Sequence, residues 1–494
     1  MAAAPTQAMV RAARARSRPR AGPADWSTPA RLWILLGAVG VSALLALLSI
    51  SLGVSDSGRA FQVVGSETAP TINDALGIYF AVSDMDADAA DYLLLNGNST
   101  GSLTPAGVLN RYEQRRQAAS DLLVSAAHNP SYDAGEHTAI LRMMVMIQIF
   151  DAYVEEAEVL DGRGDRVNAL AAYGQATDLM HAPQSGLLET ALGLASSLHD
   201  DLTARYDAAQ AEEGRDTVLI VVSMLLLIGS LGWLQVLLAR RTHRVLSLPV
   251  AGATLLAAVL FAGSIATLHA NADHLAAAKN DGYDSVYALR QLRAIAFDAK
   301  ADESRFLIDP SRAQLSEASF LAKSVELASF RQRVTIFTYD AALGTQVAAL
   351  QSGQPVRIGG AFGRALGHVV FPGEERAAAA ALTAYARFQR DDRVLRADWD
   401  SGRLSEAVRF DTSAAPNDSE GDFIAFDSAL GAWIQIHQQA FDREIAAGNG
   451  DLNGWQLYAV LGPLLIVGLA WLGVRPRLRE YAWTGVDRTA GSPE

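Results

Sequence analysis

The chain of 494 residues contains no cysteine, only three lysines and comparatively few charged side chains. The absence of cysteine excludes disulfide bonds, thiolate metal sites, iron–sulfur clusters and cysteine nucleophiles. The chain has 41 basic and 54 acidic residues, and this acidic balance argues against a nucleic-acid partner, which requires a basic face. Charged residues are 19% of the chain, below the roughly 25% of soluble domains, so part of the chain is expected to lie in a membrane.

Four apolar stretches are long enough to cross a bilayer, which requires about 20 helical residues. None of them contains Asp, Glu, Lys or Arg. They are residues 32–54, 217–239, 248–268 and 455–474. The first is predicted to be an uncleaved anchor rather than a signal peptide, because its apolar run is long and no small-residue cleavage site follows.

Arginines flank these stretches and predict their orientation. They cluster before the first span, between the second and third (Arg240, Arg241 and Arg244), and after the fourth. Positive charge near span ends stays on the cytoplasmic side. We therefore expect a multi-pass plasma-membrane protein with both termini in the cytoplasm, its cytoplasmic segments being residues 1–31, 240–247 and 475–494.

Two large segments are then predicted to lie outside, residues 55–216 and 269–454. The first has 25 acidic and 9 basic residues, the second 25 and 19. The cytoplasmic segments are basic, which is expected because the anionic lipids of the inner leaflet attract basic residues next to membrane spans. Together they hold about 60 residues in three pieces, too few for a kinase or nucleotide-binding domain, so any signal is expected to pass to a separate protein.

Apolar residues spaced by three and four predict helices in both outer segments. Ile140, Met143, Ile147 and Phe150 follow this spacing in the first segment. Breaks at 96–105, 129–130, 161–165 and 183–186 leave four or five helices, enough for an antiparallel bundle. The predicted fold is an all-α membrane protein with four transmembrane helices and two extracytoplasmic helical bundles. The order span, bundle, span occurs twice, as 32–239 and 248–474, which suggests a duplication.

The stretch 354–375 is glycine-rich and is predicted to be an irregular loop that contacts a partner outside the cell. Its candidate contact residues are Phe371, Pro372, Gly373 and Glu374, since an apolar anchor beside a charge suits an interface. The alternative is that Phe371 closes the end of the bundle.

Three polar groups carry weaker signals. The acidic run Asp84–Asp91 favours a solvated helix face over a cation site. His269, Asp273 and His274 are expected to solvate the end of the third span rather than to bind metal. The neighbouring Asp302 and Glu303 point about 100° apart on a helix, which argues against joint catalysis. We therefore expect a non-enzyme with no catalytic residue, metal ion or cofactor.

Three short stretches resemble the GlnX family of four-span membrane proteins from actinobacteria. They are YFAVSDMDADAADYLLLNG at 79–97, AKADES at 299–304 and VVFPGE at 369–374. The resemblance implies an extracytoplasmic partner, the solute-binding lipoprotein GlnH, and a cytoplasmic partner, the serine/threonine kinase PknG. It thus implies a transducer that relays the availability of aspartate or glutamate to that kinase.

The inner candidates for contact with a kinase are Arg240, Arg241 and Arg244, although topology alone also explains them. A rival hypothesis is a receptor that binds a small ligand directly in its bundles, with Arg293 and Arg305 as carboxylate clamps. A structural envelope protein is the third reading. Small residues in the spans also allow a homodimer.

Overall fold

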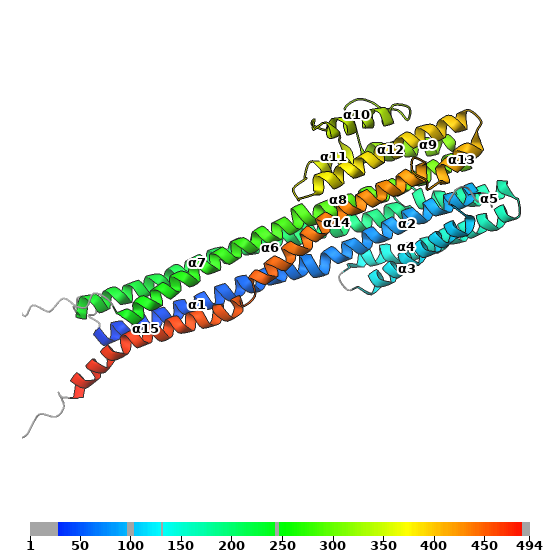
Figure 1. Ribbon diagram of the computed structural model, residues 1–494. Helices are drawn as coiled ribbons and strands as arrows, with labels where there is room; N and C mark the ends of the chain where they lie inside the picture. The colour runs from blue at the N-terminus through cyan, green and yellow to red at the C-terminus, as the bar shows by residue number, and fades with distance from the viewer. Residues whose placement is uncertain (1–27, 96–102, 130–131, 243–246, 487–494) are drawn as a thin grey trace, which may run out of the picture. The chain divides into compact units, whose positions relative to one another are not determined.

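The computed structural model describes residues 28–95, 103–129, 132–242 and 247–486 (Figure 1). Within these ranges the chain forms helices and no β-strand, apart from an isolated bridge between Ser329 and Gly359. Four of the helical stretches are long and apolar enough to cross a membrane. The predicted all-α membrane fold is confirmed.

The chain divides into two compact units. The described residues of 1–51, 218–264 and 457–494 form the span unit, and those of 52–217 and 265–456 form the bundle unit. The buried charged groups discussed below belong to the bundle unit and lie outside the four apolar stretches.

The first half of the chain contains six helices in the described ranges. They are α1 (Thr28–Gln62), α2 (Ala69–Leu95), α3 (Pro105–His128), α4 (Ala134–Gly162), α5 (Arg166–His181) and α6 (Leu187–Thr242). A π-helical segment, η1 (Val63–Thr68), joins α1 to α2. The helices end at the predicted breaks, since α3 stops before Asn129 and α5 stops before Pro183.

The described part of the second half contains nine more helices. They are α7 (Leu248–Ala276), α8 (Asp284–Ile308), α9 (Ala313–Leu327), α10 (Tyr339–Gln351), α11 (Gly360–Leu366), α12 (Glu374–Asp400), α13 (Leu404–Thr412), α14 (Ser419–Asp451) and α15 (Trp455–Val486). A second π-helical segment, η2 (Ala277–Tyr283), joins α7 to α8. The stretch 354–375, predicted to be irregular, therefore contains the short helix α11.

Local sequence explains where several helices begin. Thr104 caps α3 by accepting a hydrogen bond from the backbone of Gly107, and Pro105 occupies the first turn. Asp133 and Glu136 form a capping box at the start of α4. Asp165 caps α5 by accepting a hydrogen bond from the backbone N–H of Asn168.

The two segments predicted as separate bundles share one hydrophobic core. That core contains residues of the first segment, such as Ile78 and Phe150, together with residues of the second segment, such as Phe306 and Phe441. A second core, which includes Phe388 and Trp433, lies wholly within the second segment. Helix α2 is central because it packs against both α3 and α8.

Glycines allow α14 to approach its neighbours closely. A Cβ atom on Gly448 would lie 2.0 Å from the ring of Phe61, and one on Gly282 would lie 2.9 Å from the Cβ of Phe441. Any larger side chain at Gly448 would displace the buried phenyl ring.

Two hydroxyl pairs link α1 and α6 within the span unit. Ser49 and Ser223 form a hydroxyl pair 2.8 Å apart, and Ser42 and Ser230 form another at 3.2 Å. Hydroxyl pairs of this kind join helices in lipid, where apolar burial supplies little drive.

Candidate functional site

The acidic residues of α2 lie inside the bundle unit. Asp84, Asp86, Asp88 and Asp91 are each at most 8% exposed. The prediction of a solvated acidic face was wrong, because basic side chains from α3 and α8 face these carboxylates. Burial of so many charges requires partners. Arg115 pairs with Asp84 and Arg111 with Asp88, while Asp86 and Asp91 each belong to a larger cluster.

We call the first the Arg305 cluster. It joins α2, α5, α8 and α9, and its members are Asp86, His181, Asp298, Asp302, Arg305 and Lys323. Arg305 pairs with Asp86, and its Nη2 lies 2.5 Å from Asp302 and 3.3 Å from Asp298. Lys323 Nζ lies 2.6 Å from Asp302 and 2.7 Å from Asp298. Although burial opposes ionisation, Arg305 and His181 hold the pKa of Asp86 below its ordinary value.

Three ligand atoms of this cluster have metal-site spacing. One atom each from Asp86, His181 and Asp298 lies within 4.8 Å of the other two. The same carboxylates already pair with Arg305 and Lys323, so a dication there would face two fixed positive charges. The arrangement is better suited to holding helices together than to binding a metal ion.

We call the second the Lys300 cluster. It contains Asp91, Lys300, Glu303, Asp411 and Glu420, with Ser304 and Ser419 as hydroxyl partners. Lys300 Nζ lies 2.9 Å from Glu303 and pairs with Asp411. The Ser304 hydroxyl lies 2.9 Å from Asp91 and 3.0 Å from Asp411. Arg111 lies at the edge, 3.3 Å from Asp91 and 3.4 Å from Glu420.

Carboxylates outnumber cations around Lys300, and burial raises the pKa values of three acids in this region. Burial raises the pKa of Asp411 and of Glu420 to about 7, although Lys300 opposes the shift. Burial and the nearby Asp422 raise the pKa of Asp391 to about 8. One oxygen each of Glu303 and Asp391 is buried without a hydrogen-bond partner among the described residues. Asp411, Glu420 and Asp391 therefore exchange protons near neutral pH.

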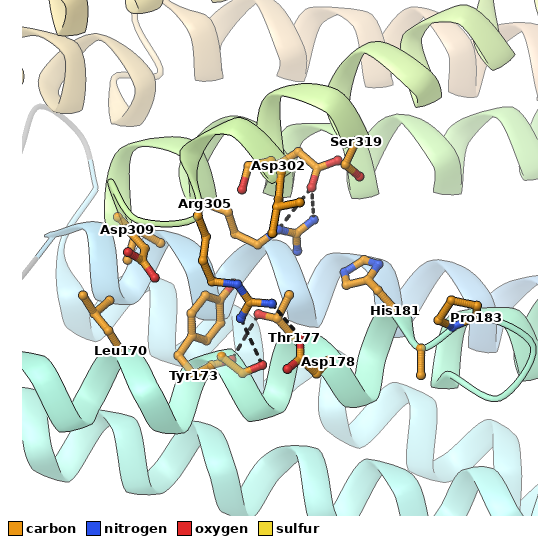
Figure 2. A pocket seen from close by; sticks show the side chains of 16 residues that line it. Leu170, Tyr173, Thr177, Asp178, His181, Pro183, Asp302, Arg305, Asp309 and Ser319 are labelled. Carbon is orange, nitrogen blue, oxygen red and sulfur yellow. Dashed lines mark hydrogen bonds and ion pairs between the residues drawn. The ribbon is translucent and has the colours of Figure 1, made fainter.

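A cavity of about 380 Å³ opens beside the Arg305 cluster (Figure 2). Its walls come from both segments of the bundle unit. Leu170, Tyr173 and Thr177 project from α5 on one side, and Asp302 and Arg305 project from α8 on the other. A molecule in the cavity would contact both segments at once.

Residues 60–211 match the sequence model of a family described as an actinobacterial sensor domain. No curated protein and no solved structure matches the chain. The sensor-domain match contains α2 with its acidic residues and α5 with the cavity wall. It ends within α6 and does not include α8, which supplies Lys300 and Arg305.

The predicted outer contact residues divide into buried and exposed ones. Glu374 is fully buried and accepts hydrogen bonds from Trp433 at 3.1 Å and from the backbone of Val370 at 2.8 Å, and it lies 2.7 Å from His437 Nε2. It anchors its loop and presents no charge at the surface. Phe371 is half-buried with its ring against that of His437.

Pro372 and Gly373 are exposed. Gly373 has a φ of +86° at the start of α12, a left-handed conformation that favours glycine.

The two predicted ligand clamps are both paired within the protein. Arg293 binds Asp427 through two hydrogen bonds of 2.5 and 2.7 Å, and its guanidinium lies 4.2 Å from the ring centroid of Phe80. Arg305 lines the cavity, but Asp86, Asp298 and Asp302 surround it.

Of the predicted inner contacts, Arg240 is exposed near the end of α6 and Arg241 lies in its last turn. Arg244 lies outside the described residues.

Sequence reasoning missed both clusters, although a signal for them was present. The stretches 79–97 and 299–304 stand out as short charged motifs. They face each other where α2 packs on α8, and Asp91 meets Ser304 there.

Proposed function

We propose that this chain is a non-enzymatic transmembrane sensor that relays extracytoplasmic aspartate or glutamate availability from a solute-binding lipoprotein to a cytoplasmic serine/threonine kinase. The observation that carries the sensing role is the sensor-domain match over residues 60–211 in a chain with four apolar helices. The two partners come from the resemblance to GlnX proteins.

Continuous helices support a transducing role. Helix α6 begins at Leu187 within the sensor-domain match and continues to Thr242, through the second apolar stretch. Residues 30–95 likewise form one unbroken helical run. Displacement of such a helix by about 1–2 Å is a known way of passing a signal.

The buried clusters support coupling between the halves of the chain. Asp86 and Asp91 of the matched region pair with Arg305 and Ser304 of α8, which continues from α7 through η2. A movement of α2 would therefore also reach the third apolar stretch.

The relay is tested by cross-linking the protein in native membranes with and without added aspartate or glutamate, followed by capture and mass spectrometry. The relay predicts recovery of a solute-binding lipoprotein and a serine/threonine kinase, at least one of them dependent on the amino acid. Recovery of neither, in cells that express both, overturns it.

The proposed inner contact is tested by replacing Arg240, Arg241 and Arg244 with glutamine. Kinase recovery should fall while lipoprotein recovery remains. Glutamine at Arg475, Arg477 and Arg479 is the matched control, since it removes the same charge elsewhere. Labelling of both termini verifies that orientation is unchanged in each variant.

A receptor that binds a small molecule directly is the second candidate. The cavity between α5 and α8 favours it, because its volume falls in the range of small-molecule sites.

A further inference from the structure

The cavity beside Arg305 has the dimensions and lining of a ligand site. Its volume is about 380 Å³, and its apolar walls are formed by Leu170, Ile308, Leu315 and the ring of Tyr173. Charged and hydroxyl side chains line the cavity from both sides, Thr177 and Asp178 from α5 and Asp302, Arg305 and Ser319 from α8 and α9 (Figure 2). A mostly apolar pocket with a few polar groups is the usual form of a small-molecule site.

The charge of the lining indicates which ligands the cavity favours. Three carboxylates line it (Asp178, Asp302 and Asp309) and two guanidinium groups (Arg305 and Arg312). Directly behind Arg305 lie two further carboxylates, Asp86 and Asp298, and a single lysine, Lys323. Negative charge therefore exceeds positive charge by two when His181 is neutral.

Neither guanidinium is available to an anion. The Arg305 donors point to three carboxylates. Arg312 donates to Asp178 at 2.6 Å and to the backbone of Gly174 at 3.4 Å. A carboxylate ligand would have to displace one of these acids and enter a region of excess negative charge.

One buried group in the wall has an unused hydrogen-bonding capacity. Tyr173 is 4% exposed, and its hydroxyl lies near Arg305 and Thr177 but forms no hydrogen bond of ordinary geometry among the described residues. A buried polar atom without a partner is uncommon in a folded protein and costs free energy. The hydroxyl oxygen can accept a hydrogen bond, and the ring can attract a cation to its face.

We propose that this cavity binds a small organic molecule carrying a primary ammonium group. The ammonium group donates hydrogen bonds to the carboxylate of Asp309, which pairs with no cation among the described residues, and to the Tyr173 hydroxyl. The ligand's carbon chain lies against Leu170 and Leu315. The inference deepens the proposed sensing function, because the ligand would join α5 of the matched region to α8 and α9.

Binding is tested by isothermal titration of the full-length protein in lipid nanodiscs. Putrescine and n-butylamine are the cationic probes, and glutamate and succinate are the anionic ones. We expect saturable binding of at least one amine that weakens as salt concentration rises, and no binding of either anion at this site.

The location is tested by filling the cavity. Ser319 is half-buried in the wall, so Ser319→Trp should weaken amine binding at least tenfold. The neighbouring Ala318 is exposed and does not line the cavity, so Ala318→Trp is the matched control and should bind as the unmodified protein does. Asp309→Asn should also weaken binding without filling the cavity.

Four outcomes overturn the inference. In the first, neither amine shows saturable binding, and in the second, glutamate binds as well as the amines do. In the third, Ser319→Trp leaves amine binding unchanged. In the fourth, Zn²⁺ binds but the amines do not, and His181→Ala abolishes the binding of Zn²⁺. The measurement reads binding directly, so the cavity proposal can fail while the lipoprotein-to-kinase relay holds. The relay can likewise fail in the cross-linking experiment while amine binding holds.

Discussion

Asp86 and Asp91 lie five residues apart on α2, and both are buried, yet their pKa values shift in opposite directions. The pKa of Asp86 is lowered, despite burial, because Arg305 and His181 face it. Burial raises the pKa of Asp91, and Lys300, which opposes this, is shared among several acids. The comparison teaches that the ratio of cations to carboxylates, rather than burial alone, decides which buried acid stays charged.

The largest effect is expected from Arg305→Met. The change leaves Asp86, Asp298 and Asp302 buried with too few cations, and loss of one partner from a buried ion pair costs about 3–5 kcal/mol. Urea unfolding in detergent micelles at pH 7 should report a loss of this size. Arg312→Met removes an exposed pair and should cost less than about 1 kcal/mol. Equal losses would contradict the assignment of Arg305 as the central cation.

Lys300→Met should destabilise the protein strongly at pH 8 and much less at pH 5.5. Asp411 and Glu420 have pKa values near 7, so at the lower pH they take up protons and need the lysine less. Unfolding free energies measured at both pH values should show a larger recovery for Lys300→Met than for Arg305→Met. If the two variants recover equally, the two clusters do not differ as described.

The pH dependence of the unmodified protein tests the same difference. Asp391 has a pKa of about 8, against about 4 when unfolded, so the folded state holds more protons between these values. The contribution of Asp391 to stability is then largest below about pH 4 and declines as pH rises toward 8. Asp391→Asn should flatten the decline and stabilise the protein at pH 8 by roughly 1–3 kcal/mol. A slope unaltered by the substitution would exclude Asp391 as its source.

The smallest effect is expected from Ser304→Ala. It removes a hydroxyl between Asp91 and Asp411 and should cost about 1 kcal/mol at pH 7. Ser401→Ala, at an exposed helix end, is the control and should change stability by less than about 0.5 kcal/mol. A thermal-shift assay in micelles is sufficient to rank the two.

Periodicity and breakers in the sequence predicted the helices and most of their ends. Ile140, Phe150 and their neighbours form the buried stripe of α4, and the breaks near Asn129 and Pro183 were correct. These features are local, so the sequence alone carries them.

The candidate site could not be predicted in this way, because its partners are far apart in the chain. Asp86 and Arg305 are 219 residues apart, and a pattern of apolar residues does not indicate which charges will meet. Glu374 shows the same limit, since its burial depends on Trp433 and His437 of a distant helix.

The two π-helical segments occupy equivalent places in the two halves of the chain. η1 follows the helix of the first span, and η2 follows the helix of the third. A π-helical turn holds more residues than an α-helical turn and is rare. Two unrelated halves have little reason to acquire the same irregularity at the same point. Its recurrence is expected if one ancestral half already contained the extra residue before its gene was copied and joined to itself.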